Sequence, residues 1–298
     1  MDNLLNRFVC GLVVVALSSR WTQAEEKPVP SQVAHLNIVF NASNADDVHQ
    51  FYGTILGLKR IPDIDLPGDS NMLRYLGGES EIKFIVRGRK LAKTEGGTHY
   101  ARGIRLLAFL FPESERAALL QRLQAADQAV PEFTSGTSPA GYSFSYGMLF
   151  DGDGNQVEIV FLGDGAPPEK FKQIQIGLNV SDQQAMDQFL VDVLGFQPEV
   201  TDGRIHRAVM GVSQLKYWQG KPELPALSGN PMAKLGMNLI QFLVPDVDAV
   251  RSMVLANGGK IHTEPFALGN LATIMFVEGP DGIVFEFAGP LLDRFKSK

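Results

Sequence analysis

An internal repeat is the feature of this sequence that most constrains its fold. Residues 41–58 and 179–196 align without a gap and share Asn, Ser, Gln, Phe, Leu and Gly at corresponding positions. Residues 103–112 align in the same way with residues 236–245, from a leading glycine to a closing proline. The chain is therefore predicted to contain four units of two alternating kinds, each of about 55–60 residues.

Each unit is predicted to run from a strand through a helix into further strands. In the first unit, residues 34–40 alternate, with apolar residues such as Leu36 and Phe40 on one face. Asn44 suits an N-cap before apolar residues at helical spacing, and Gly57 ends that run. The other units repeat this order, which predicts four βαβββ units.

These units resemble the vicinal oxygen chelate superfamily, which includes glyoxalases, bleomycin-resistance proteins and extradiol dioxygenases. The resemblance covers nearly all of residues 32–289, and it implies an α+β fold of four βαβββ units paired into two tandem glyoxalase-like domains. We expect these domains over residues 32–162 and 171–290, with residues 163–170 as a linker rich in Gly, Pro and charge. The most specific matching residues are Phe51, Tyr52, Leu56, Gly57, Asp153, Gly154, Asn155 and Glu158.

The first 24 residues are predicted to be a signal peptide. Arg7 precedes an apolar run of about ten residues, which is too short to cross a bilayer. Thr22 and Ala24 supply the small side chains expected before a cut ahead of Glu25. We therefore expect an exported protein, periplasmic or secreted, with no stable membrane insertion after cleavage; a retained anchor is the alternative.

Charge and cysteine content narrow the function classes. The formal net charge is −6, from 33 acidic and 27 basic residues, which argues against nucleic-acid binding. Cys10 is the single cysteine and lies inside the predicted signal peptide, so the mature chain has no disulfide and no thiolate metal ligand. The expected partner is a small-molecule ligand, and the sequence leaves the oligomeric state open.

The resemblance also implies candidate site residues. Members of the superfamily hold a divalent metal between the first and last strands of paired units, inside a cupped sheet. If neighbouring units pair, the first cup holds His35, Lys83, Arg105 and Glu158, and the second cup holds Gln173, Lys216, Asn238 and Glu286.

Only His35 and Glu158 of the first cup are ordinary metal ligands, for Fe, Zn, Ni or Mn. In this interpretation Glu158 is a ligand or a general base. The substrate-binding candidates are Lys83, Arg105, Gln173, Lys216, Asn238 and Glu286. A lysine and an arginine opposite a glutamate form a floor suited to an anionic or hydroxylated ligand. The alternative is a structural ion-pair network.

Three functions remain open at this point. The chain is expected to be a metal-dependent lyase or dioxygenase, a small-molecule-binding protein with degenerate metal sites, or a duplicate that binds a partner and no ligand. Fold alone does not decide among these functions. The metal content of the purified protein distinguishes the first from the second.

Overall fold

The structure is a computed structural model that describes residues 36–66, 68–92, 100–138, 140–199, 203–225 and 233–296. The predicted signal peptide and His35 lie outside these residues. Within the described part of the chain, no helix is long and apolar enough to cross a membrane.

The first two units follow the predicted order. Unit one contains β1 (Asn37–Ala42), α1 (Ala45–Val48), its π-helical continuation η2 (His49–Ile55), β2 (Lys59–Leu66), β3 (Ser70–Gly77) and β4 (Ser80–Arg87). Unit two contains β5 (Gly103–Pro112), η3 (Glu113–Glu115), α2 (Arg116–Ala125), β6 (Thr134–Thr137), β7 (Ser143–Phe150) and β8 (Gln156–Leu162).

The last two units repeat the plan. Unit three follows η4 (Pro168–Lys172), into which the predicted linker runs, and contains β9 (Ile174–Val180), α3 (Gln183–Gln188), η5 (Phe189–Val193), β10 (Gln197–Glu199), β11 (His206–Met210) and β12 (Ser213–Gln219). Unit four contains β13 (Gly236–Leu243), α4 (Val247–Ala256), β14 (Lys260–Leu268), β15 (Ala272–Glu278), η7 (Pro280–Gly282) and β16 (Val284–Gly289), and η8 (Asp293–Phe295) follows it.

The repeated sequence signals form the same local structures in both halves. The Asn44 side chain accepts from the backbone N–H of Asp47 and caps α1, and Asp182 caps α3 through the N–H of Ala185. Gly57 and Gly195 end the two helices at φ values of 72° and 75°, in the left-handed region that favours glycine. These matched caps confirm that units one and three are copies of one design.

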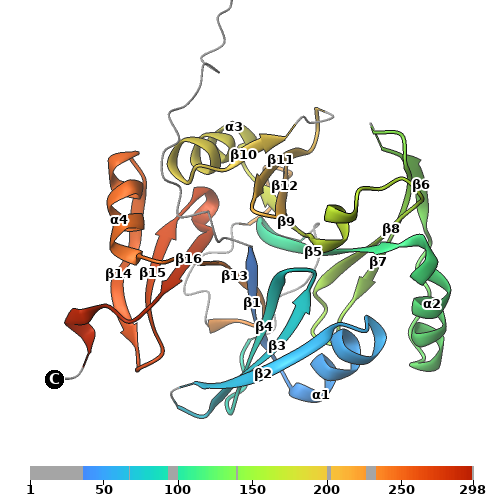
Figure 1. The fold of residues 1–298 in the computed structure, drawn as a ribbon, viewed down its shortest axis with the longest axis horizontal. Coiled ribbons are helices and arrows are strands. Elements are labelled where there is room, and N and C mark those ends of the chain that lie inside the picture. Colours follow the sequence, from blue (N-terminus) through green and yellow to red (C-terminus); the bar gives the residue numbers. More distant parts are fainter. Residues whose placement is uncertain are drawn as a thin grey trace, which may run out of the picture.

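The strands form two eight-stranded sheets, which confirms the predicted fold class. The order in the first sheet is β14-β15-β16-β13-β1-β4-β3-β2. The order in the second sheet is β10-β11-β12-β9-β5-β8-β7-β6. Strands β1, β13, β5 and β9 lie in the middle of the molecule, and α1 to α4 lie towards its rim (Figure 1).

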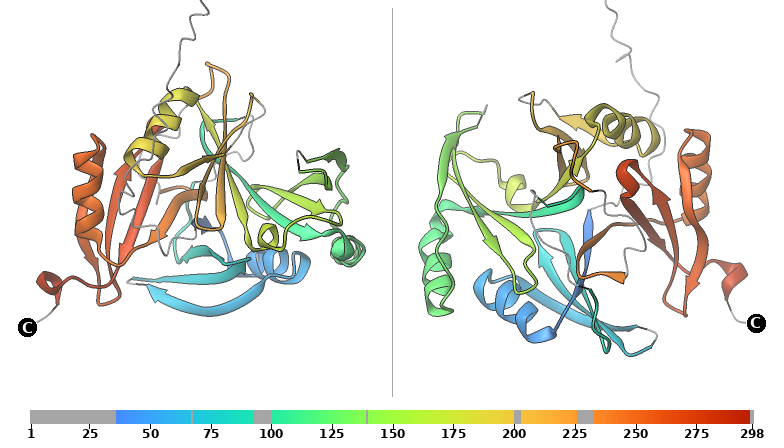
Figure 2. Two further views of the ribbon diagram at one scale, coloured as in Figure 1. Left: turned by 45° about the horizontal axis from the view of Figure 1, so that its top comes forward. Right: turned by 180° about the vertical axis from the view of Figure 1, so that it is seen from behind.

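The pairing of the units differs from our expectation, in which unit one pairs with unit two and unit three with unit four. The first sheet joins units one and four through the antiparallel pair β1 and β13, whereas the second joins units two and three through β5 and β9. The outer strands of units four and two therefore lie at opposite ends of the molecule in both views of Figure 2. The four residues expected in each cup are consequently divided between the two sheets.

Units one and two still contact each other, as do units three and four, but through loops and helices rather than paired strands. The Arg122 side chain of α2 donates to the backbone carbonyl of Ile55 at the end of η2. A carboxylate oxygen of Asp153 accepts from the N–H of Ser43 at 2.9 Å, and Asp281 accepts from Ser181 at 2.7 Å in the other half. Each predicted half is thus held together without a complete sheet of its own.

One buried apolar core joins all four units. It contains one face of every central strand and the inner faces of the helices, including Phe40, Phe84, Phe161 and Phe285. Ser80 and Ser213, at equivalent positions in units one and three, are fully buried, and their hydroxyls lie 2.7 Å apart. Such self-contact of equivalent residues is expected where two copies meet about a twofold axis.

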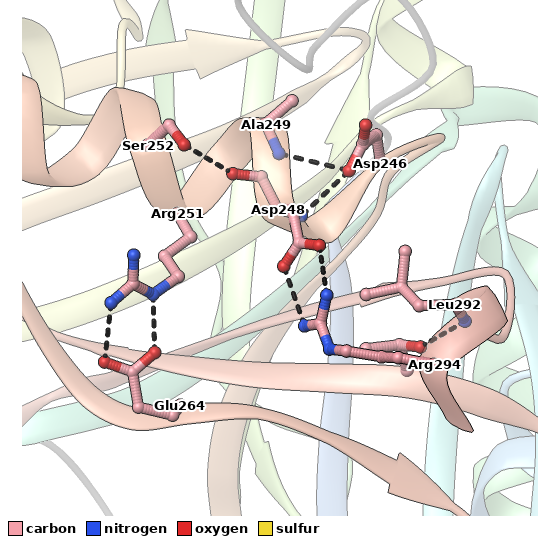
Figure 3. Close-up of polar contacts among 9 residues, drawn as sticks. Asp246, Asp248, Ala249, Arg251, Ser252, Glu264, Leu292 and Arg294 are labelled. Atoms are coloured by element: carbon pink, nitrogen blue, oxygen red, sulfur yellow. Dashed lines mark hydrogen bonds and ion pairs between the residues drawn. The ribbon is translucent and has the colours of Figure 1, made fainter.

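The C-terminal residues are held against α4. Asp246 caps α4 by accepting from the N–H groups of its first turn, and the next acidic residue, Asp248, accepts a two-pronged contact from Arg294 of η8 (Figure 3). The Arg251 guanidinium donates two hydrogen bonds to the carboxylate of Glu264 on β14 in the same way. The Arg294 guanidinium lowers the pKa of Asp248, so this exposed contact is an ion pair at neutral pH.

Cleavage of the chain between the halves is expected to leave the molecule assembled. We would introduce a protease site at Asp164 and Gly165, which are exposed, and cut the folded protein there. The fragments should elute together in size-exclusion chromatography without denaturant, because β1 pairs with β13 and β5 with β9 across the cut. Separation into two folded halves would contradict this strand order.

Candidate functional site

Each sheet has one face in the apolar core and a second face, here called the site face, that carries buried polar residues. Along β4, Ile82 and Phe84 point into the core, and Lys83 points the other way. Along β12, Leu215 and Tyr217 point into the core, and Lys216 points the other way. The two lysines occupy equivalent positions, so the duplication has produced two candidate sites.

The site face of the first sheet holds a hydrogen-bonded row from three strands. The Lys83 ammonium donates to Oε1 of Gln241 on β13, and Nε2 of Gln241 donates to Oε1 of Glu286 on β16 at 2.8 Å. All three residues are buried, between 5% and 6% exposed. The Lys83 ammonium also lies 3.3 Å from Glu81, whose carboxylate is gripped by Arg74 at 2.8 Å.

Burial disfavours both charges at the ends of this row. Desolvation lowers the pKa of Lys83, although the charges of Glu81 and Glu286 oppose the shift. Desolvation also raises the pKa of Glu286, against its hydrogen bond from Gln241 and the charge of Lys83. An anionic group brought to Lys83 would therefore favour its charged form.

A separate aliphatic cluster lies on the same face beside Lys83. It consists of Val39, Met72, Ile85, Leu239 and Val284, with Ile64, Leu66 and Phe276 packed against it. Val39 is the register partner of both Lys83 and Leu239, which places the cluster directly against the polar row. Apolar surface with a few convergent polar groups is the usual composition of a small-molecule site.

The site face of the second sheet holds the duplicate row in a different arrangement. The Lys216 ammonium donates directly to Oε2 of Glu158 on β8, and both residues are buried. The sequence repeat places Ala108 of β5 where the first sheet has Gln241. Because alanine places no amide between the two strands, the lysine reaches the carboxylate itself.

Arg105 and Asn238, predicted to bind substrate, occupy matching irregularities in the central strands. The β5 register shifts between Ile104 and Leu106, so Arg105 is an extra, bulged residue. The sequence repeat places Asn238 at the same point of β13, where the first sheet also has a register shift. The Asn238 side-chain amide donates to the backbone carbonyl of Lys234 at 3.2 Å. Arg105 is buried, and this burial lowers the pKa of its guanidinium.

The predicted cups are thus not assembled as expected. Lys83 and Glu286 meet in the first sheet, and Glu158 and Lys216 meet in the second, because units one and four pair, as do units two and three. Gln173 precedes β9, and Gln175 rather than Gln173 is in register with Gln214, which lies two residues before Lys216 on β12. The sequence analysis missed Gln241 and Gln214, although the alternation of core residues on β13 and β12 places both on the site faces.

The described residues do not fit a divalent metal. No three His, Cys, Asp or Glu side chains come together in the part of the chain that the structure describes. The two strand-end carboxylates, Glu158 and Glu286, each face a lysine, directly or through Gln241. A protonated lysine has no lone pair for a metal and repels it. The predicted ligand His35 precedes β1 of the first sheet in the sequence, whereas Glu158 lies in the second sheet.

The comparisons with known proteins support this fold. Residues 172–287 match the model of the Glyoxalase/Bleomycin resistance protein/Dioxygenase superfamily. These residues therefore resemble that superfamily in sequence. The match spans units three and four, so the resemblance inferred from the repeat is confirmed for this part of the chain by sequence as well as by fold. No curated protein sequence matches the chain.

Three solved structures show the same architecture over nearly the whole chain. A glyoxalase I variant from Zea mays has a TM-score of 0.64 and 16% identity, with 88% of this chain and 95% of that chain covered. A candidate dioxygenase from Bacillus subtilis has a TM-score of 0.62 and 14% identity, with 88% and 86% covered. The cppA protein from Streptococcus pneumoniae has a TM-score of 0.50 and 11% identity, with 87% and 98% covered. These likenesses establish the fold, and the activity must be argued from the sites.

The second row yields a stability prediction. Lys216→Met leaves the Glu158 carboxylate buried without its cation and should lower the free energy of unfolding by about 3–5 kcal/mol. The double variant Lys216→Met with Glu158→Leu should recover most of this loss, because it removes both buried charges. Urea denaturation at pH 7 measures both effects, and a single variant as stable as the parent would show that the ion pair is not buried.

Proposed function

We propose that the chain is a small-molecule-binding protein in which lysines have replaced the metal, and that the first sheet binds an aliphatic molecule with an anionic or carbonyl head. The observation that carries this proposal is the aliphatic cluster set against Lys83 on the face opposite the main core. A buried cluster of this kind offers apolar contact, and the lysine offers a donor at its edge.

The charges beside the cluster favour an anionic head group. Glu81 stays ionised, since Arg74 and Lys83 lower its pKa despite its partial burial. Its charge is balanced by Arg74, to which it is joined by two hydrogen bonds. Burial favours the neutral form of Glu286. The remaining cation is Lys83, which an incoming carboxylate or polarised carbonyl oxygen would stabilise.

Octanoate and octanol are suitable probes, because they share an aliphatic chain and differ in the charge of the head group. Octanoate should bind about tenfold more tightly than octanol, the difference expected for one charged hydrogen bond. Lys83→Met should abolish this preference and leave octanol binding unchanged. Isothermal titration calorimetry measures both affinities, and circular dichroism confirms that each variant is folded.

The second sheet provides the matched control. The double variant Lys216→Met with Glu158→Leu changes the equivalent lysine and its carboxylate, and it should keep the preference for octanoate. Equal binding of octanoate by the parent and Lys83→Met would contradict the proposed site.

A metal-dependent lyase or dioxygenase is the second candidate function, because both sheets keep a glutamate at the closing-strand position, Glu158 and Glu286. It requires a ligand such as His35 in addition to the described residues. Elemental analysis of the purified protein should find no stoichiometric Fe, Zn, Ni or Mn. A stoichiometric metal that is lost in His35→Ala would overturn the metal-free proposal in favour of this enzyme.

We also infer export, which rests on the signal-like composition of the first 24 residues. The protein recovered from the periplasm or medium should begin at Glu25, and N-terminal sequencing measures this directly. A cytosolic product that retains Met1 would contradict the inference, without affecting the proposed binding site.

A further inference from the structure

The two site faces have diverged at equivalent positions, and the second sheet offers a different surface from the first. The repeat aligns Val39 of β1 with Gly177 of β9, and Ile85 of β4 with Trp218 of β12. In the first sheet, both positions belong to the aliphatic cluster. In the second sheet, the first position is a glycine without a side chain, and the second position carries the indole ring of Trp218.

The two changes in the second sheet depend on each other. A Cβ atom added to Gly177 would lie 3.0 Å and 3.1 Å from the Cη2 and Cζ3 atoms of Trp218, and 2.7 Å from the Cβ of Leu106. The six-membered ring of the indole therefore packs over the backbone of the neighbouring strand at a point where only glycine leaves room. Trp218 is half-buried, so this packing fixes its ring against the sheet and leaves part of it accessible.

An unpaired acceptor lies on the same strand, two positions before Lys216. The Gln214 side chain is 2% exposed, and its Nε2 donates to the Glu199 carboxylate. Its carbonyl oxygen, Oε1, is buried and has no hydrogen-bond partner. Leaving a buried acceptor unsatisfied costs about 1–3 kcal/mol, so this oxygen is suited to a donor from outside the chain.

Charged side chains of both signs surround Gln214. Lys216 contacts Glu158 directly, and Arg207 is the register partner of Lys216 on β11. Glu199, the partner of Gln214, also lies 3.7 Å from Lys170. Both carboxylates here are thus paired with a cation, and the surface offers hydrogen-bond donors and acceptors side by side. A polar ligand with several hydroxyl groups can hydrogen-bond to both members of such pairs.

We propose that the site face of the second sheet binds a neutral, polyhydroxylated ring of the saccharide class, stacked on Trp218 and donating a hydroxyl hydrogen bond to Oε1 of Gln214. The C–H face of such a ring is positively polarised and packs on the negative face of an indole. Its hydroxyls satisfy the orphaned amide oxygen and accept from or donate to the Lys216–Glu158 pair.

This second site goes beyond the proposed function of the first sheet and is independent of it. The first sheet has aliphatic residues where the second has Trp218 and Gly177, so one ligand does not suit both faces. The two halves of the duplicated chain would then bind chemically different molecules.

The full chain gives a direct optical test, because its two tryptophans are Trp21 and Trp218. In a Trp21→Phe background, all tryptophan emission comes from Trp218. Titration with methyl glucoside, maltose and N-acetylglucosamine should give a saturable change in emission for at least one saccharide. Failure of all three would overturn the proposal, and so would saturable binding of the charge-free aromatic naphthol in their place.

Two variants in the same background test the assigned contacts. Gln214→Leu removes the orphaned oxygen and should weaken saccharide binding by about tenfold or more. Circular dichroism checks that this variant, which also loses the hydrogen bond to Glu199, is folded. Gly177→Ala introduces the Cβ that collides with Trp218, so it should shift the emission spectrum of the free protein and abolish binding. Unchanged saccharide affinity in both variants would overturn the assignment.

Val39→Ala in the first sheet is the matched control and should bind saccharide like the parent. Octanoate binding distinguishes the two proposals: Gln214→Leu should leave it unchanged, so that either site can fail its test while the other stands.

Discussion

The antiparallel pairing of β1 with β13, and of β5 with β9, is the constraint from which the rest of the structure follows. Each of these strands is the first strand of its unit. When two first strands pair, they lie in the middle of the sheet, and the closing strands of the two units lie on either side of them. Lys83 on β4 is thereby joined to Glu286 on β16 through Gln241, and Lys216 on β12 contacts Glu158 on β8 directly. Neither site exists within a single unit, or within either predicted half of the chain. The duplication and the pairing together therefore produce two sites from one repeated set of side chains.

The repeat predicted the four units because glycines, caps and strand alternation are local signals, read within about 20 residues. The structure shows the local roles of such residues: helices begin at the N-caps Asn44 and Asp182 and end at Gly57 and Gly195. The choice of partner is not local: all four units begin with a mainly apolar strand, and nothing within such a strand specifies which other first strand it pairs with. The expected cups were wrong for this reason. Lys83 and Glu286 were predicted in different cups, whereas the structure joins them in one sheet through Gln241.

Gln241 shows what strand pairing adds to residue identity. Taken alone, it is one polar residue in an apolar strand, and no motif marks it. In the first sheet it bridges Lys83 and Glu286. In the second sheet the equivalent residue is Ala108, and the equivalent lysine and glutamate contact each other directly. A glutamine in place of an alanine on the central strand thus separates the lysine from the glutamate and joins them by two hydrogen bonds. In this arrangement burial lowers the pKa of Lys83 and raises the pKa of Glu286, so it disfavours the charged form of each. Alternation places Gln241 on the correct face, but only the pairing shows which groups it joins.

A carboxylate at the closing-strand position can be neutralised by a metal or by an ammonium group, and both rows use the second solution. The ammonium group keeps the local charge balanced, so neither sheet buries an isolated carboxylate. It also frees the rest of each site face from the requirement to supply metal ligands. The first sheet then keeps aliphatic residues at Val39 and Ile85, while the second exchanges them for Gly177 and Trp218. Because the small residue makes room for the large one, total volume is conserved and the change costs little packing energy. The other residues of the two site faces can therefore differ, because in each sheet the strand pairing already places a lysine to neutralise the buried carboxylate.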